Sequence, residues 1–244
     1  MSYLINKKKQ KIAYKATKGG SPGIVFIHGL NSDMNGQKAL SIEKYAKNNN
    51  LAFVRFDCRG HGQSDGKFEN FTISDWKQDL IEVIKNLTKG PQILIGSSMG
   101  GWLMMLASKS KSKNILGLIG LAASVDFGND LYKNLSAKNK NEIIKKGITK
   151  YVTYGFSYLL TSKFFVEAKK NNILNTNFKF SKPMILIHGL KDEIVNANMP
   201  KKIMKNTTSK NIQIIYLKKS THRLSQPIDL FTINSAINTI RSLI

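Results

Sequence analysis

The chain has 244 residues, of which 41% are hydrophobic, and this is enough for one large domain with a buried core. Its 38 basic and 15 acidic residues give a net charge of +23, but only four of the basic residues are arginines and the lysines are scattered. Because bidentate recognition of phosphates and bases favours arginine, this composition argues against a specific nucleic-acid-binding protein. The single cysteine, Cys58, excludes an internal disulfide and is interpreted as a small buried thiol.

The sequence shows neither a signal-peptide pattern at its N-terminus nor a membrane-spanning apolar run. Residues 1–17 lack an apolar segment of signal-peptide length, and the apolar run at 115–123 is too short to cross a bilayer. We therefore expect a cytoplasmic protein with no transmembrane segment.

In the first half of the chain, short apolar runs alternate with amphipathic segments. Residues 3–5 and 11–16 predict a hairpin at the edge of a sheet. The following pattern indicates buried strands and helices in alternation, as in a parallel sheet that helices cover on both faces. The predicted strands are 24–28, 51–56, 92–95 and 115–122, and the predicted helices are 36–48, 72–87 and a segment from Trp102 onward.

The alternation stops at residue 127 and resumes near residue 184. Between them, residues 127–180 hold no strand-length apolar run, but show amphipathic helical spacing at 141–148 and 164–173. Such a segment is too long for an ordinary loop, so it predicts a small helical cap inserted into the sheet domain. After it the sequence predicts strands at 184–188 and 212–217 and helices at 197–205 and 227–244.

The most informative motif lies at the end of the strand at 92–95. Gly96-Ser97-Ser98-Met99-Gly100 matches G-x-S-x-G between a predicted strand and a predicted helix. A serine at the tip of such a turn needs glycine on both sides, because Cβ atoms there would clash. The helix that follows directs its N-terminal N–H groups at developing negative charge. The pattern predicts Ser98 as a nucleophile, and the alternative is a plain glycine turn.

A serine nucleophile needs a base, and the chain has four histidines. Where a G-x-S-x-G turn carries the nucleophile, the order along the chain is serine, acid, histidine. His28 and His188 each end a predicted buried strand, and His61 lies in a glycine turn. His222 alone follows a C-terminal strand and is the predicted base, with a surface-loop histidine as the alternative.

The acid that orients this base is predicted at the carboxyl end of a strand. Catalytic groups collect at that edge of a parallel sheet, and Asp192 follows the strand at 184–188. Asp126, after the preceding strand, is the second candidate and Glu193 the third. Asp192 could also do no more than cap a turn.

The oxyanion of the reaction needs two backbone donors. The N–H of Met99 directly follows the nucleophile, and Gly29 allows the N–H of Leu30 to approach closely. The histidines are dispersed, and no phosphate loop or dinucleotide fingerprint is present, so we expect neither a metal nor a cofactor.

Several of these segments together resemble the α/β-hydrolase superfamily. They are His28-Gly29, the turn Asp57-Cys58-Arg59-Gly60-His61-Gly62-Gln63-Ser64, the motif Gly96 to Gly100, Asp192 and His222. The resemblance implies an α/β-hydrolase fold, with a mostly parallel eight-stranded sheet and helices on both faces. It also implies serine-esterase or thioesterase chemistry with Ser98, Asp192 and His222 as the triad.

Within this superfamily the chain is similar to the depalmitoylating serine thioesterases, a family with mitochondrial and bacterial members that also hydrolyses acyl glucuronides. In that family an acidic residue usually precedes the histidine, whereas here the position is Thr221. The lack of an arginine-rich presequence favours a bacterial cytosolic member. The similarity rests on Met34-Asn35-Gly36-Gln37-Lys38-Ala39, on Arg55-Phe56-Asp57, on residues 90–104 and on His222-Arg223-Leu224-Ser225.

The sequence therefore predicts one domain over residues 1–244 with a cap at about 127–180. Its predicted activity is hydrolysis of carboxylic esters or thioesters of small molecules or acylated proteins, and its oligomeric state is left open. The cap aromatics Tyr154, Phe156 and Tyr158 are interpreted either as an acyl pocket or as the core of the cap. The competing functions are a non-catalytic binding protein with the same fold and, less favoured, a basic nucleic-acid-binding protein.

Overall fold

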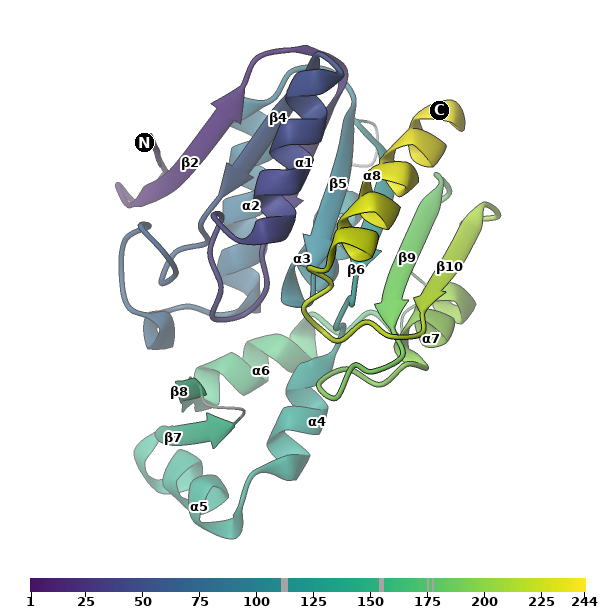
Figure 1. The fold of residues 1–244 in the computed structure, drawn as a ribbon. Coiled ribbons are helices and arrows are strands. Elements are labelled where there is room, and N and C mark those ends of the chain that lie inside the picture. Colours follow the sequence, from purple (N-terminus) through teal and green to yellow (C-terminus); the bar gives the residue numbers. More distant parts are fainter. Residues whose placement is uncertain (111–113, 154–155, 175, 177) are drawn as a thin grey trace.

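The computed structural model describes residues 1–110, 114–153, 156–174, 176 and 178–244. Its main element is an eight-stranded sheet with the strand order β1-β2-β4-β3-β5-β6-β9-β10 (Figure 1). β1 and β2 form the predicted antiparallel hairpin, β2 also pairs antiparallel with β4, and the remaining neighbours are parallel. The strands are β1 (Ser2–Ile5), β2 (Lys11–Thr17), β3 (Gly20–Ile27), β4 (Leu51–Phe56), β5 (Gln92–Ser97), β6 (Ile115–Leu121), β9 (Met184–Gly189) and β10 (Ile212–Leu217).

Helices cover both faces of this sheet, as predicted. α1 (Gln37–Asn48) and α8 (Pro227–Ser242) pack on one face, while α2 (Ile73–Leu87), α3 (Met99–Ser110) and α7 (Met199–Asn206) pack on the other (Figure 1). The apolar side chains of each helix meet those of the strands in a separate core on each face. Fully buried side chains such as Ile42 and Ile237 on one face and Trp76 and Trp102 on the other hold the sheet between them.

The chain leaves this arrangement between β6 and β9. The segment there contains α4 (Phe127–Asn134), α5 (Ala137–Lys146), β7 (Ile148–Thr153), β8 (Phe156–Thr161) and α6 (Ser162–Lys170). We call residues 127–180 the inserted segment. In Figure 1 it lies below the carboxyl ends of the sheet strands, with α5 farthest from them.

The prediction of a helical cap describes this segment only in part. Its described residues include three helices, but β7 and β8 pair as antiparallel strands, which the sequence did not predict. The predicted helix at 141–148 ends early because Gly147 adopts φ 73°, which closes α5 and starts β7. In the hairpin, Thr149 and Leu160 are buried whereas Lys150 and Leu159 are exposed, so exposure alternates with the period of a strand.

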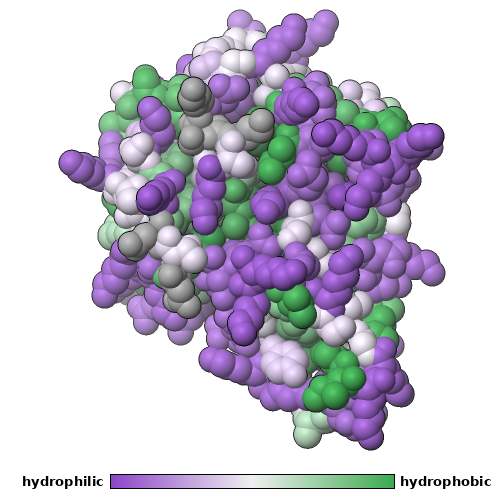
Figure 2. Space-filling model, turned by 180° about the vertical axis from the view of Figure 1, so that it is seen from behind, coloured by the Kyte–Doolittle hydropathy of each residue, from purple (hydrophilic) through white to green (hydrophobic). Residues whose placement is uncertain are grey.

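Aromatic side chains join the inserted segment to the sheet domain. The ring of Tyr158 lies 5.9 Å from that of Phe68 in the short helix η1 (Phe68–Asn70), and the rings of Phe127 and Trp102 lie 5.3 Å apart. The indole N–H of Trp102 also donates to the backbone oxygen of Asn171, at 3.0 Å. Figure 2, the view from behind, shows hydrophilic side chains over much of the surface and small hydrophobic patches on the inserted segment.

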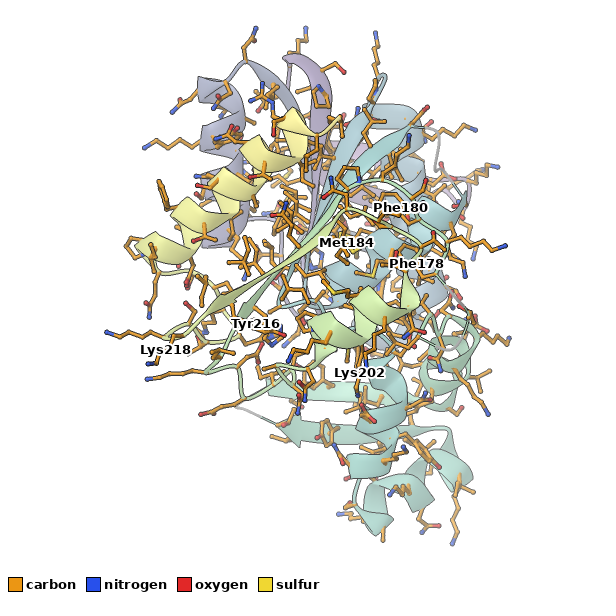
Figure 3. All side chains as sticks on the ribbon, turned by 90° about the vertical axis from the view of Figure 1, so that its right-hand side faces the viewer. Phe178, Phe180, Met184, Lys202, Tyr216 and Lys218 are labelled. Carbon is orange, nitrogen blue, oxygen red and sulfur yellow. The ribbon has the colours of Figure 1, made fainter. Side chains whose placement is uncertain are left out.

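The far edge of the sheet is formed by β10, and Figure 3 shows α7 and α8 on opposite sides of β9 and β10. The rings of Phe178 and Phe180 are stacked 6.0 Å apart where the chain enters β9. The hydroxyl of Tyr216 in β10 donates to the backbone oxygen of Ala197, at 2.9 Å, and so ties the β9–α7 loop to the sheet. Within the described residues, no helix is long and apolar enough to cross a membrane.

Candidate active site

Ser98 lies on a sharp turn between β5 and α3. Its backbone has φ 52°, a left-handed conformation that non-glycine residues rarely adopt. The turn is held by three backbone hydrogen bonds, in which the N–H of Ser98 donates to Leu121 and the N–H groups of Gly101 and Ser124 donate to Ser98. The side chain is half-buried, so the turn holds the hydroxyl at the carboxyl edge of the sheet rather than within the core.

The glycines of the motif are required by close backbone contacts. A Cβ atom on Gly96 would lie 2.3 Å from the oxygen of Gly100, and a Cβ atom on Gly100 would lie 2.3 Å from the oxygen of Ile27. A Cβ atom on Gly29 would lie 3.2 Å from Cβ of Ser98, so the loop after β3 comes directly against the serine. These distances explain physically why the G-x-S-x-G spacing marks such a turn.

Asp192 and His222 are brought together at the same edge of the sheet. Asp192 follows β9 and His222 follows β10, and Nδ1 of His222 lies 2.8 Å from Oδ2 of Asp192. The other carboxylate oxygen, Oδ1, accepts the backbone N–H groups of Ile194 at 2.9 Å and Val195 at 2.8 Å. The Asp192 carboxylate is fully buried and the His222 ring is 19% exposed, so the pair is open only on the histidine side.

The charge of Asp192 is stabilised in spite of its burial. Burial would raise the pKa of this carboxyl, but the hydrogen bond and charge of His222 and the two backbone N–H groups outweigh it, and the pKa lies below its ordinary value. Asp192 is therefore an ionised carboxylate at neutral pH, able to orient the imidazole and to stabilise its protonated form.

Backbone contacts hold the acid turn against the histidine loop. The N–H of Lys191 donates to the oxygen of Ser220 at 3.0 Å, and a Cβ atom on Gly189 would lie 2.2 Å from that oxygen. The ammonium of Lys38 on α1 donates to the backbone oxygen of Arg223, next to His222. These contacts fix the two loops relative to each other and to α1.

Strand register places Ser98 at the level of this pair. Ser97 pairs with Leu121, Leu121 with Ile187, and His188 with Tyr216, so β5, β6, β9 and β10 end together. Among the residues that the structure describes, Oγ of Ser98 makes no hydrogen bond, to His222 or to any other group. Hydrogen bonds between catalytic groups are often long before substrate binds. The site is therefore defined by the position of Ser98, Asp192 and His222 at the carboxyl ends of neighbouring strands, and not by a bond between Ser98 and His222.

Two of the other histidines, His28 and His61, and the cysteine Cys58 have different surroundings from His222. The ring of His28 is occupied on both sides, because Nδ1 lies 2.7 Å from the oxygen of Gly29 and Nε2 accepts the N–H of Cys58 at 3.0 Å. Burial, with a smaller effect of His28, lowers the pKa of His61 to about 3. Cys58 is fully buried, and burial raises the pKa of its thiol well above the ordinary value. None of these groups is suited to serve as base or nucleophile at neutral pH.

The alternative acids are placed elsewhere by the structure. Both oxygens of Asp126 accept backbone N–H groups of the inserted segment, from Ile173 at 2.9 and 3.0 Å and from Leu174 at 2.8 Å. Asp126 therefore closes the inserted segment and does not contact His222. Glu193 is exposed in the turn beside Asp192.

The two predicted oxyanion donors flank the serine. Met99 is the first residue of α3, and Leu30 follows Gly29 in the loop after β3. In the described part of the chain, neither N–H donates to a protein acceptor. Both groups are thus available to an oxyanion at Ser98.

The predicted pocket aromatics are described only in part. Tyr154 lies outside the described residues, and so does the side chain of Phe156. Tyr158 is half-buried, and its ring contacts Phe68 of the sheet domain. Leu160 and Phe164, from the same cluster, are buried and belong to the core that joins the inserted segment to the sheet.

Two residues near the site were not singled out from the sequence. His188 was interpreted only as the end of a buried strand, yet its Nε2 lies 3.4 Å from Oδ2 of Asp192. Lys38 lies in a segment used only for family resemblance, yet it binds the loop of His222. The four-residue spacing of His188 and Asp192 was the one available signal.

Among the described residues, no group of three His, Cys, Asp or Glu side chains could hold a metal ion.

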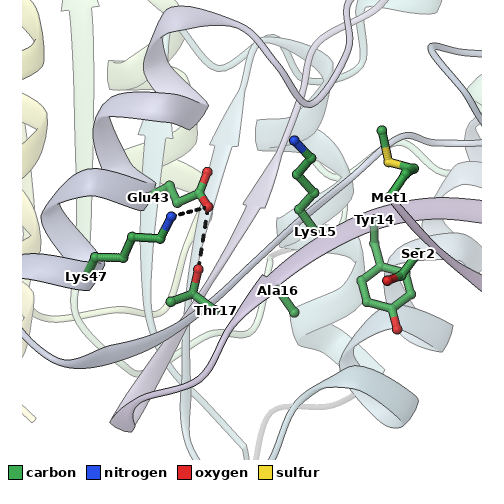
Figure 4. Close-up of a pocket in the computed structure, with 8 residues that line it drawn as sticks. All are labelled: Met1, Ser2, Tyr14, Lys15, Ala16, Thr17, Glu43 and Lys47. Atoms are coloured by element: carbon green, nitrogen blue, oxygen red, sulfur yellow. Dashed lines mark hydrogen bonds and ion pairs between the residues drawn. The ribbon is translucent and has the colours of Figure 1, made fainter.

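One surface depression lies at the other end of the sheet, beside β1 and β2 (Figure 4). In it, Glu43 accepts from Lys47 at 3.0 Å and from Thr17 at 3.5 Å, so its carboxylate is already paired. The depression is not part of the Ser98 site. It lies beside β1 and β2, at the opposite edge of the sheet from β9 and β10, which lead to Asp192 and His222. The depression is lined by Met1, Ser2, Tyr14, Lys15, Ala16, Thr17, Glu43 and Lys47.

A mostly parallel eight-stranded sheet, a serine on a left-handed strand-to-helix turn and an Asp–His pair after the last two strands define an α/β hydrolase. Residues 22–174 match the family model described as "Serine aminopeptidase, S33", and the chain belongs to this family of serine hydrolases. The sequence-based prediction of a hydrolase with an α/β-hydrolase fold is confirmed.

The similarity to relatives that are named as hydrolases or thioesterases extends over nearly the whole chain. Palmitoyl-protein thioesterase ABHD10 from Bos taurus is 35% identical over 252 residues, which cover 100% of this chain and 82% of that protein. The structure of the mouse α/β hydrolase domain-containing protein 10 superimposes with a TM-score of 0.91 at 33% identity, over 99% of this chain and 98% of that one. A putative hydrolase from Agrobacterium vitis has a TM-score of 0.91 at 25% identity, covering 98% and 97%. The resemblance to the thioesterase family is therefore confirmed.

Proposed function

We propose that this hydrolase cleaves carboxylic esters or thioesters through an acyl-enzyme on Ser98. The observation that carries the proposal is the arrangement at one sheet edge of a left-handed serine turn and a buried Asp192–His222 pair with a 2.8 Å hydrogen bond. Each group matches a step of acyl transfer, and the sequence order of serine, acid and histidine matches as well.

In the proposed reaction, Oγ of Ser98 attacks the acyl carbonyl while Nε2 of His222 takes its proton. The N–H groups of Met99 and Leu30 bind the oxyanion of the tetrahedral intermediate. Asp192 holds Nδ1 of His222 and stabilises the imidazolium. His222 then returns the proton to the leaving alcohol or thiol, and water, activated by the same histidine, releases the acid and restores Ser98.

We infer a thioester or an activated ester as substrate, carried by a small molecule or by an acylated protein. Two relatives, from Bos taurus and Homo sapiens, are named palmitoyl-protein thioesterases, which supports an acylated substrate. A thiolate is a better leaving group than an amine and needs less help from His222 as acid. The inserted segment exposes apolar side chains such as Val152 and Leu159. We propose Tyr158, together with Tyr154 and Phe156, as residues of the acyl pocket.

Two further proposals concern organisation and location. We propose that residues 1–244 are a single α/β-hydrolase domain into which residues 127–180 are inserted as a cap. The relatives named above carry the word mitochondrial in their names, so the cytoplasmic location expected from the sequence stays a prediction.

The direct test is covalent labelling of the serine. A fluorophosphonate probe should add its mass to the peptide that contains Ser98, and Ser98→Ala should abolish labelling and lower turnover of a p-nitrophenyl acyl ester by about 10⁴-fold or more. Ser97→Ala is the matched control, because this neighbouring serine is buried at the end of β5. Labelling should persist in Ser97→Ala, and near-normal turnover of Ser98→Ala would refute the assignment.

A further inference from the structure

His188 lies behind the proposed acid, at the end of β9. Its imidazole is fully buried, and Nε2 lies 3.0 Å from the backbone oxygen of Val195 and 3.4 Å from Oδ2 of Asp192. This is the same carboxylate oxygen that contacts Nδ1 of His222 at 2.8 Å. Two imidazoles therefore converge on one oxygen of Asp192, one from inside the protein and one from the site.

The surroundings of His188 define its protonation state. Nδ1 is buried and has no hydrogen-bond partner among the described residues. A protonated Nδ1 without an acceptor would be a buried, unsatisfied donor on a charged ring, which is more costly than an unpaired lone pair on a neutral ring. The acceptors at Nε2 require the proton there, so the ring is neutral with the proton on Nε2. Burial also lowers the pKa of His188, against the opposing effects of Val195 and Asp192.

We propose that His188 is a positioning residue for the acid of the triad, an inference that rests on the proposed function. Its single N–H bonds the oxygen of Val195, and the same nitrogen lies in electrostatic contact with Oδ2 of Asp192, at 3.4 Å. This contact joins the backbone of the acid turn to the carboxylate, and keeps Oδ2 directed at His222. Because the ring is neutral, it supplies a donor dipole without a second positive charge that would repel the imidazolium of His222.

The contact also acts on the catalytic ring through the carboxylate. The N–H dipole of His188 beside Oδ2 reduces the negative potential that Asp192 exerts at the position of His222. Other charged groups near this cluster are Lys38 on α1, Asp229 on α8, Arg223 beside His222 and Glu193 beside Asp192, and all of them are kept in the variants compared. Tyr216, which pairs with His188 across β9 and β10, directs its hydroxyl to Ala197 instead.

The experiment compares three variants by the pH dependence of kcat/KM for a p-nitrophenyl ester. His188→Leu removes the donor, and His188→Gln keeps an N–H at a similar reach. Tyr216→Phe is the matched control, because it removes a hydrogen bond of 2.9 Å to the same β9–α7 loop without touching Asp192.

We expect His188→Leu to move the acid limb of the profile upward by about 0.5 pH unit. Its plateau value of kcat/KM should fall by about tenfold, because the carboxylate is held less firmly. His188→Gln should restore the limb, and Tyr216→Phe should leave it in place while lowering the midpoint of thermal unfolding. An unmoved acid limb in His188→Leu, or an equal shift in His188→Gln, would overturn the proposal.

A measurement on the unmodified protein covers the case in which the variants fail to fold. In ¹⁵N-histidine NMR spectra, His188 should appear as the neutral tautomer with its proton on Nε2 at every pH between about 5 and 9. Titration in this range, or a proton on Nδ1, would exclude the role. The tautomer and the titration seen by NMR do not depend on turnover. A result against the role of His188 can therefore be told apart from an unlabelled Ser98, which would refute the proposed function itself.

Discussion

The turn after β9 and the turn after β6 each hold a buried carboxylate, but the two carboxylates have different partners. Asp192 gives one oxygen to two backbone N–H groups and leaves the other to histidine side chains. Asp126 gives both oxygens to the backbone N–H groups of Ile173 and Leu174. Position at a strand end therefore does not define a catalytic acid. The two aspartates differ in whether one carboxylate oxygen stays available for a titratable side chain, as it does in Asp192 and not in Asp126.

Exchange of each carboxylate for an amide gives the largest contrast between the two turns. Asp192→Asn should lower kcat by about 10⁴-fold, because the amide favours the wrong tautomer of His222. Asp126→Asn should stay within about tenfold of the wild-type kcat, because an amide oxygen still accepts a backbone N–H, and should mainly reduce thermal stability. Steady-state kinetics and thermal unfolding of both variants measure this. The reverse ranking would place the catalytic acid in the turn after β6.

A smaller effect on kcat/KM is expected from the inserted segment, which the hydrogen bonds of Asp126 close. If Tyr158 lines an acyl pocket, kcat/KM should rise by up to about fourfold per added carbon until the pocket is full. Tyr158→Ala should then shift the preferred ester toward longer chains in a series from acetate to palmitate.

Tyr132→Ala is the control for this series. Tyr132 is also half-buried in the inserted segment, but its ring packs on Phe165, at 5.1 Å, rather than on the sheet domain. Its chain-length profile should match that of the wild type. An unchanged profile in Tyr158→Ala with a large loss of stability would assign Tyr158 to the core alone.

The smallest expected effect is on the free energy of unfolding. It concerns two lysines, Lys38 near the turn of Asp192 and Lys109 near the turn of Asp126. Burial lowers the pKa of the Lys38 ammonium, which binds the loop of His222, from 10.5 to about 8. Between these values the unfolded chain holds a proton that the folded chain has released, so this group makes folding more favourable as the pH rises through the window. The free energy of unfolding of wild type minus that of Lys38→Met should therefore increase from pH 8 to 10.5.

Lys109 provides the comparison for Lys38. It is exposed at the end of α3 and is the cation that acts on Asp126. In urea titrations, Lys109→Met should differ little from wild type in the free energy of unfolding, because the lost charge is exposed. A constant difference between wild type and Lys38→Met across the window would contradict the burial of this ammonium.

The parts of the fold that were predictable are those with a fixed spacing. Buried parallel strands are continuous apolar runs, and the glycines around Ser98 are required by contacts near 2.3 Å, so both leave a pattern in the sequence. The hairpin of β7 and β8 was not predictable, because its buried face includes the polar Thr149 while the apolar Val152 and Leu159 are exposed, so no polar–apolar alternation marks the strands. The contact of His188 with Asp192 arises from the shape of one turn, and no periodicity encodes it.

Asp126 and Asp192 show the same limit at a single position. Both follow a buried strand, and the sequence ranks them only by their order along the chain. Their difference depends on segments that come later, residues 173–174 for one and the loop of His222 for the other. Such long-range pairing is set by tertiary structure.

The position of β10 at the edge of the sheet has a consequence for how this protein loses activity. Within the described parts of the chain β10 pairs with β9 alone, its side chains are mostly half-buried, and the loop that carries His222 begins where it ends. Opening of an edge strand costs less free energy than global unfolding, because fewer apolar contacts are lost. The proposed base can thus leave its place while the serine turn, between central strands, stays folded. We therefore expect inactivation by heat or denaturant to begin as a local, reversible event at this edge, ahead of the cooperative unfolding of the core around Trp76 and Trp102.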